Sequence, residues 1–179
     1  TYNHAVKLSY QRPFDGVTSQ NFFGQAELPL IRWMEKNGYD VSYTTQLDMS
    51  RDANLSITPA QHKILISAGH DEYWSAENRT VWERARNNGV NLAFFSGNEI
   101  YWKTRWEDNM KTLVCFKEGT LGENNCGGAC DPSELWTGLW RDGCGPVYAN
   151  PANYGGAIDA CNPENQLGGQ ISWVNGVGT

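Results

Sequence analysis

Four consecutive residues, His70-Asp71-Glu72-Tyr73, carry the side chains best suited to chemistry in this sequence. Carboxylate, phenol and imidazole groups together suit iron, manganese or zinc, and a carboxylate or an imidazole can also move protons in catalysis. In the alternative interpretation, the two acids only place favourable negative charge at the start of a following helix. We favour a ligand or catalytic role for Glu72 and for His70. Asp71 and Tyr73 are interpreted as an orienting carboxylate and a packed ring.

Other polar side chains also follow apolar runs that are typical of strands. Asn98 and Glu99 come shortly after the run 90–95, Tyr10 ends the run 5–10, and Lys117 ends the run 112–117. Asn98 is suited to donating a hydrogen bond to a substrate carbonyl or a developing oxyanion, and Glu99 is a further catalytic candidate. Ionisable side chains after several strands are typical of a site built on a scaffold, although surface loops are polar in any case.

A serine hydrolase is disfavoured. Ser96 follows Phe94-Phe95, where a nucleophile would be exposed, but the G-x-S-x-G signature is absent. No His follows Ser96 within this chain to complete a catalytic triad.

The candidate residues require a scaffold of alternating strands and helices. We expect strands at 5–10, 40–45, 63–67, 90–95 and 112–117, and helices around 26–36, 76–88 and 98–106. Ser75 is expected to cap the second of these helices. Alternating elements predict a parallel sheet with helices on both faces, so we assign a three-layer, flavodoxin-like α/β fold. In such folds ligands bind beyond the carboxyl ends of the strands, where the candidate residues stand.

The stretch 119–163 breaks this pattern and is expected to be a loop-rich insertion within one domain covering 1–179. It contains four cysteines (Cys126, Cys130, Cys144 and Cys161). Their spacings lack the paired C-x2-C arrangement of zinc sites, so two disulfides in a protein outside the cytosol are the favoured interpretation. Cys115 lies in an apolar run and is predicted to be a buried thiol.

Composition excludes several classes of function. A net charge of −6 with 14 basic residues disfavours nucleic acid and anionic lipid as partners. No apolar run reaches the ~20 residues needed to cross a bilayer. Of the eight tryptophans, Trp33 and Trp82 are predicted to be core residues. Trp136 and Trp140 leave open an alternative function, a non-catalytic module that binds a carbohydrate or a protein partner.

Several motifs together resemble one family, the C-terminal domain of the large (beta) subunit of N,N-dimethylformamidase. They are, in chain order, SYQRPF (9–14), ELPLIRW (27–33), NGYDVSY (37–43), GHDEYWS (69–75), FFSGNE (94–99), TLVCFK (112–117) and NPEN (162–165). The resemblance covers most of the chain apart from the Cys-rich stretch.

This resemblance implies a glutamine-amidotransferase-like α/β domain with one ferric ion held by two tyrosinates and a glutamate, and hydrolysis of a formamide C–N bond. The glutamate matches Glu72, and one tyrosinate is assigned to Tyr10. His70, Asn98 and Lys117 match other motif residues. The second tyrosine is expected before Thr1, and the domain is expected to continue past Thr179. The expected partners are a small amide substrate and other domains of the parent chain or a second copy, and the Cys-rich stretch indicates a secreted relative.

Overall fold

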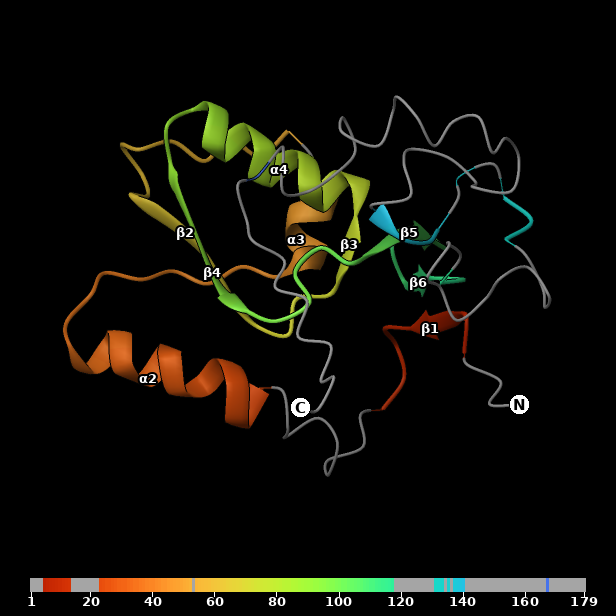
Figure 1. The fold of residues 1–179 in the computed structure, drawn as a ribbon, viewed down its shortest axis with the longest axis horizontal. Helices are drawn as coiled ribbons and strands as arrows, with labels where there is room; N and C mark the ends of the chain where they lie inside the picture. Colours follow the sequence, from red (N-terminus) through yellow and green to blue (C-terminus); the bar gives the residue numbers. More distant parts are fainter. Residues whose placement is uncertain are drawn as a thin grey trace, which may run out of the picture.

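The protein is described by a computed structural model that covers residues 5–13, 23–52, 54–117, 131–133, 135, 137–140 and 167. These residues form a mixed α/β fold (Figure 1). Its elements are β1 (Lys7–Ser9), the π-helix η1 (Phe23–Glu27), α2 (Leu28–Lys36), α3 (Gln46–Arg51), β2 (Ile64–Gly69), β3 (Tyr73–Ser75), α4 (Ala76–Asn87), β4 (Asn91–Ser96), β5 (Trp102–Glu107) and β6 (Thr112–Val114). None of the helices in this part of the chain has the length and apolar character needed to cross a bilayer.

The strands form two small sheets. β2 and β4 pair in parallel, and the other sheet has the order β1-β6-β5-β3. In this second sheet β3 runs parallel to β5, whereas β6 runs antiparallel to both β5 and β1. The predicted parallel sheet is therefore correct for β2–β4 and wrong for β1 and β6, which pair antiparallel. The strands β3 and β5 are not among the predicted ones. The flavodoxin-like and glutamine-amidotransferase-like assignments stay predictions.

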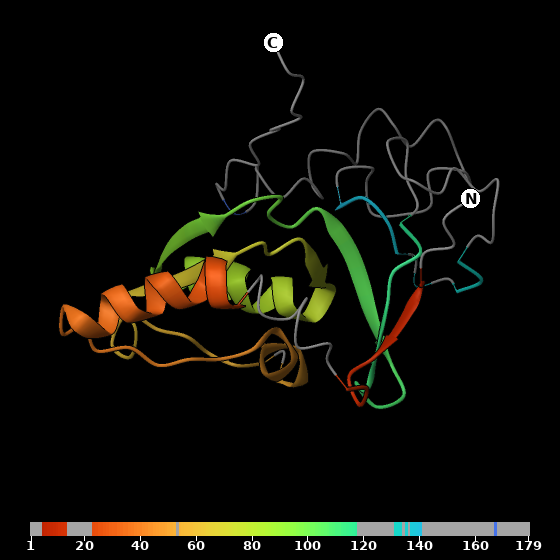
Figure 2. The same cartoon turned by 90° about the horizontal axis from the view of Figure 1, so that it is seen from below.

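The helices lie around the β2–β4 pair. Figures 1 and 2 draw α2 and α4 on opposite sides of this pair, with β1, β5 and β6 side by side and away from α2. α4 begins where predicted, because the Ser75 hydroxyl accepts a hydrogen bond from the Asn78 amide and so caps the first turn. Pro29 lies in the first turn of α2, the position at which proline fits a helix.

The hydrophobic core lies between α3, α4 and the strands. It is built around buried residues of α4, with aromatic rings from β3 and β4. The ring of Trp82 stacks on Phe94 with centroids 5.3 Å apart and lies 5.1 Å from the ring of Trp74. The prediction that Trp82 is a core residue is confirmed. Trp33 is 54% exposed, so the same prediction for Trp33 is wrong; α2 has no buried residue, and Trp33 stacks on Tyr39 instead.

Two predicted elements are absent. Residues 40–45 form no strand, because no segment in the described part of the chain pairs with them; Thr45 instead caps α3, and Tyr43 donates a hydrogen bond to Glu35. The predicted helix at 98–106 is also wrong. Asn98 and Ile100 have φ of 53° and 51°, which stops a right-handed helix, and the chain continues as β5.

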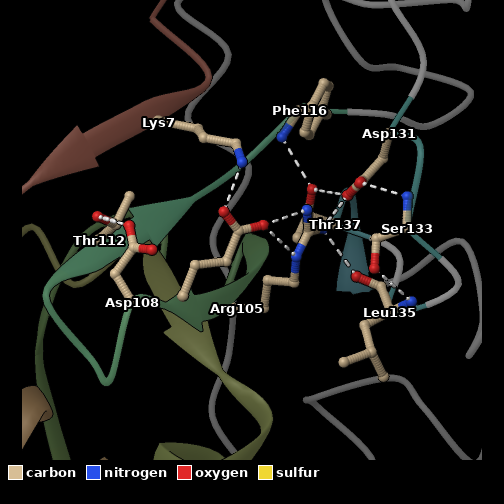
Figure 3. Close-up of polar contacts among 10 residues, drawn as sticks. Lys7, Arg105, Asp108, Thr112, Phe116, Asp131, Ser133, Leu135 and Thr137 are labelled. Atoms are coloured by element: carbon tan, nitrogen blue, oxygen red, sulfur yellow. Dashed lines mark hydrogen bonds and ion pairs between the residues drawn. The ribbon is translucent and has the colours of Figure 1, made fainter.

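On one side of the β1–β6–β5 strands, ion pairs and hydrogen bonds tie Asp131, Leu135 and Thr137 to the sheet (Figure 3). Arg105 on β5 forms ion pairs with Glu107 and with Asp131, whose side chain is 1% exposed. Lys7 on β1 also pairs with Glu107. Thr137 donates to Asp131 (2.8 Å) and accepts from the Phe116 amide (2.9 Å). The described part of the predicted insertion is therefore packed against the sheet.

The structure describes only a small part of the Cys-rich stretch, so most predictions for this stretch lie outside the described residues. Leu139 forms an antiparallel bridge with Trp102 at the start of β5, so this short piece of the stretch lies against a strand. The cysteines Cys126, Cys130, Cys144 and Cys161 lie outside the described residues, as does Trp136. Cys115 is a free thiol.

Candidate functional site

A pocket of about 440 Å³ lies against the β1–β6 pair. It brings together four of the six predicted site residues, Tyr10, His70, Glu72 and Lys117. The complete lining is Ala5, Val6, Leu8, Tyr10, Gln46, His70, Asp71, Glu72, Tyr73, Leu113, Cys115 and Lys117. Tyr10 and Glu72, which are more than 60 positions apart in the sequence, therefore face one cavity.

One face of the β1–β6 pair forms a wall of this pocket. Val6, Leu8 and Tyr10 alternate along the first chain segment, and Leu113, Cys115 and Lys117 alternate along the other; all six line the cavity. Side chains two residues apart in an extended strand point to the same face, which explains the pattern. The pairing continues beyond the strands, because the Tyr10 amide donates to the Lys111 carbonyl (2.8 Å) and the Cys115 amide to the Val6 carbonyl (2.9 Å).

This arrangement revises the reason why Tyr10 and Lys117 come together. β1 and β6 are antiparallel, so their carboxyl ends lie at opposite ends of the pair. The two residues share the pocket because it extends along the face of the strands. The rule for parallel sheets, which predicts a site beyond the carboxyl ends, applies here only to the turn that follows β2.

The turn after β2 supplies His70, Asp71 and Glu72, and Asp71 holds this turn in place. The Asp71 carboxylate accepts hydrogen bonds from Ser67 (2.7 Å) and Gln46, and its carbonyl accepts from the Trp74 indole (2.9 Å). Burial raises the pKa of Asp71 above its ordinary value, and the hydrogen bonds offset part of that rise. These contacts fit an orienting carboxylate that links the turn to α3 and β2.

Glu72 is fixed at both its backbone and its carboxylate. Its carbonyl accepts hydrogen bonds from the amides of Tyr101 (3.0 Å) and Trp102 (2.8 Å). Its Oε1 accepts a hydrogen bond from the Trp102 indole nitrogen, at 3.0 Å. An indole donates only one hydrogen bond, so this contact fixes the position of Oε1 and leaves Oε2 without a bond from Trp102.

Lys117 and Tyr73 lie beside Glu72. The Lys117 ammonium is 5.3 Å from the centre of the Tyr73 ring and 5.2 Å from the centre of the Trp102 ring. Both distances are within the range of cation–π attraction. Burial raises the pKa of Tyr73, and a hydrogen bond with Lys117 offsets part of the rise. Tyr73 is therefore a pocket residue as well as a packed ring.

Tyr10 and His70 are the exposed members of the four predicted site residues in the pocket. The Tyr10 ring packs edge-on against Trp106, with centroids 5.0 Å apart, and partial burial raises the pKa of its phenol. The His70 ring lies over Gly97: a Cβ atom on that glycine would be 3.0 Å from Cε1 and 3.2 Å from Nδ1 of the imidazole. The His70 ring can therefore occupy this position because Gly97 has no side chain.

The other two predicted site residues do not line this pocket. Asn98 is exposed and has a left-handed backbone, and Glu99 is buried at 3% exposure. Both follow β4, as predicted, but the loop turns after Gly97 and carries them out of the pocket lining.

Sequence reasoning missed Gln46 and Trp102 as members of the site. Gln46 lies in the first turn of α3, in a segment that carried no motif, and reaches Asp71 from there. Trp102 was assigned to a helix that does not form. The signal that could have found it is the alternation of aromatic, β-branched and charged residues in WKTRWE (102–107), which is typical of a strand.

The donor groups at this pocket fit a hard metal ion. The phenol of Tyr10, the carboxylate of Glu72 and the imidazole of His70 are oxygen and nitrogen donors of the kind that iron accepts. In the described part of the chain, no group of three or more His, Cys, Asp or Glu side chains could hold a metal. His70, Asp71 and Glu72 line this pocket without forming such a group, so the fit to a metal rests on the chemistry of the donors.

Comparison with known proteins identifies the family. The sequence matches the family described as N,N-dimethylformamidase beta subunit-like, C-terminal, over residues 1–178. The chain belongs to this family.

Two curated relatives are proteins named N,N-dimethylformamidase beta subunit. The one from Alcaligenes sp is 27% identical over 77 residues, and the one from Paracoccus aminophilus is 26% identical over 77 residues. Each alignment covers 43% of this chain and 10% of the relative. The aligned part of the chain thus spans about a tenth of the length of these relatives, and the resemblance found in the motifs is confirmed.

Proposed function

We propose that this chain carries the hydrolytic site of an enzyme that cleaves the C–N bond of a small amide. The family relation supports a domain related to a hydrolase. The observation that carries the proposal is the pocket lined by Tyr10, His70, Glu72 and Lys117. A cavity of about 440 Å³ has room for a small amide together with water.

In this proposal each side chain has a defined task. Lys117 donates a hydrogen bond to the amide carbonyl oxygen and stabilises the negative charge that forms there when water adds to the carbon. His70 accepts a proton from the attacking water and delivers one to the departing amine nitrogen. The products are a carboxylic acid and an amine. Leu8 and Leu113 supply an apolar surface for the substituents of the amide.

The proposal includes one ferric ion, held by Glu72 and Tyr10. When bound, such an ion supplies Lewis acidity, which polarises a carbonyl or activates a water molecule. Trp102 leaves one oxygen of Glu72 available for this role, because its indole hydrogen bond goes to Oε1 alone.

The proposed assembly follows from the relatives. Both are beta subunits, so we propose that the chain works with other parts of its own polypeptide or with a further subunit. The test should therefore use the intact parent protein together with any subunit that copurifies with it.

The test is amine release from a panel of small amides that includes N,N-dimethylformamide. We expect Glu72→Gln to lower kcat/KM by at least about 10²-fold, because a neutral amide replaces the carboxylate that would hold the metal ion. Glu35→Gln is the matched control: Glu35 is an exposed carboxylate on α2 outside the pocket, so its loss should leave the activity unchanged. Undiminished activity of Glu72→Gln would remove the proposal.

The alternative module that binds carbohydrate or protein is not favoured. It relied on exposed rings of Trp136 and Trp140, and Trp140 is 6% exposed. The centre of the Trp140 ring instead lies 4.7 Å from the Arg79 guanidinium carbon and 5.4 Å from the Lys103 ammonium. The Trp140 ring is therefore not available for stacking on a sugar.

A further inference from the structure

Trp102 contacts three of the residues that line the pocket, although it does not line the pocket itself. It stands at the first position of β5, where its backbone is in register with Tyr73 on β3. Its amide donates to the Glu72 carbonyl and its indole nitrogen donates to Glu72 Oε1. The face of the same ring lies 5.2 Å from the Lys117 ammonium.

The Trp102 ring has little freedom to move. It is 4% exposed, and the edge of the Tyr101 ring packs on it with centroids 4.9 Å apart. The antiparallel bridge to Leu139 fixes its backbone from another side. A buried tryptophan held in this way presents its N–H and its π face in directions that cannot vary independently.

The two contacts act on opposite charges. The indole N–H gives the Glu72 carboxylate a hydrogen bond to a charged acceptor, which is stronger and shorter than one between neutral groups. The negative face of the ring attracts the ammonium of Lys117. One rigid ring therefore sets the position of the Glu72 carboxylate and of the Lys117 ammonium relative to each other.

We infer that Trp102 is the positioning residue of this pocket, holding the Glu72 carboxylate and the Lys117 ammonium at a fixed separation. This inference rests on the proposed hydrolytic function for its catalytic consequence, but the contact between Trp102 and Glu72 can be tested without any substrate. The contact is tested by NMR and its catalytic consequence by kinetics. In each measurement, a tryptophan that only stabilises the fold would give a different result from a positioning residue.

The first measurement is an NMR spectrum of the protein labelled with ¹⁵N at its tryptophan indoles, in wild type and in Glu72→Gln. Eight indole signals are expected in full, one for each tryptophan. Trp102→Phe identifies the signal of Trp102 by its loss. We expect Glu72→Gln to move this signal upfield, because a neutral amide is a weaker acceptor than a carboxylate. Trp140 supplies the reference signal, since it lies outside the pocket and its indole nitrogen has no hydrogen-bond partner among the described residues.

The second measurement is kinetic. Trp102→Phe keeps an aromatic face for Lys117 and removes the N–H together with the five-membered ring. Because the hydrogen bond to Glu72 is lost, kcat should fall by about 10–100-fold, the usual loss when a residue that orients a ligating group is changed. Trp140→Phe is the matched control and should keep wild-type kcat. Trp102→Leu, which removes the face as well, should lose more activity than Trp102→Phe.

The outcomes separate this inference from the proposed function. A Trp102 indole signal that stays in place in Glu72→Gln overturns the inference whether or not any amide is hydrolysed. Wild-type kcat in Trp102→Phe overturns it even when the signal moves. A signal that moves in a protein that hydrolyses none of the amides supports the contact and rejects the proposed reaction.

Discussion

The substitution Gly97→Ala tests how His70 is placed. A Cβ atom at this position would lie 3.0 Å from Cε1 and 3.2 Å from Nδ1 of His70, whereas ordinary contact begins at 3.4 Å. The imidazole must therefore shift by at least about 0.4 Å. Gly97 does not have a left-handed φ, so its backbone accepts alanine without strain.

The expected loss of activity follows from that displacement. A misplacement of 1 Å can cost about 10²-fold in rate, so a shift of a few tenths of an ångström should lower kcat by roughly tenfold. Stability should change by less than about 1 kcal/mol, because a flexible side chain gives way and alanine reduces the entropy of the unfolded chain.

The assay combines amide hydrolysis, urea denaturation and the NMR signals of the His70 ring. Gly24→Ala is the matched control, because a Cβ atom there meets no atom within 4 Å and the residue lies outside the pocket. Gly97→Ala with wild-type kcat and displaced His70 signals would show that the His70 ring has no part in the reaction. Unchanged His70 signals would show that the ring does not lie over Gly97.

Three further predictions concern groups around the pocket. Burial raises the pKa of Cys115 to about 12, so iodoacetamide should leave it unmodified in the folded protein at neutral pH and label it after unfolding, as read by mass spectrometry. Arg105→Ala removes the cationic partner of the buried Asp131 and should cost about 3–5 kcal/mol in urea denaturation; Lys7→Ala, which breaks an exposed pair, should cost no more than about 1 kcal/mol, and equal losses would contradict this interpretation. Burial raises the pKa of Asp71 in the folded state above its ordinary value of 3.8, so the folded chain keeps a proton that the unfolded chain loses. The free energy of unfolding should therefore fall as pH rises from 3.8 through the raised pKa of Asp71. Asp71→Asn should flatten this fall, and a pH dependence identical to that of the wild type would contradict the prediction.

Local signals predicted the elements around the turn that carries His70 to Tyr73. The apolar runs of β2 and β4 and the cap at Ser75 are each encoded within a few neighbouring residues, so they could be read from the sequence. The segment 40–45 has equally strong β-forming residues and forms no strand. Strand formation needs a partner, and no pattern within the segment itself reveals whether one exists.

The site was predictable as a set of residues but not as a geometry. Strand ends pointed to Tyr10, Glu72 and Lys117, and these do share a pocket. The antiparallel pairing of β1 with β6 depends on contacts across about 100 positions of sequence, and it could not be inferred from local periodicity. The contact between Trp102 and Glu72 was not predictable either, because the expected helix at 98–106 would not place Trp102 beside Tyr73 as a strand does.

The claim that Tyr10 and Glu72 act at one reacting centre is tested most directly by a double-mutant cycle on kcat/KM for amide hydrolysis. The variants are Tyr10→Phe, Glu72→Gln and the protein carrying both substitutions. Residues that act as one unit give non-additive losses, so the double variant should be little worse than Glu72→Gln alone. Losses that multiply would show that the two side chains act independently, and would contradict a shared catalytic pocket.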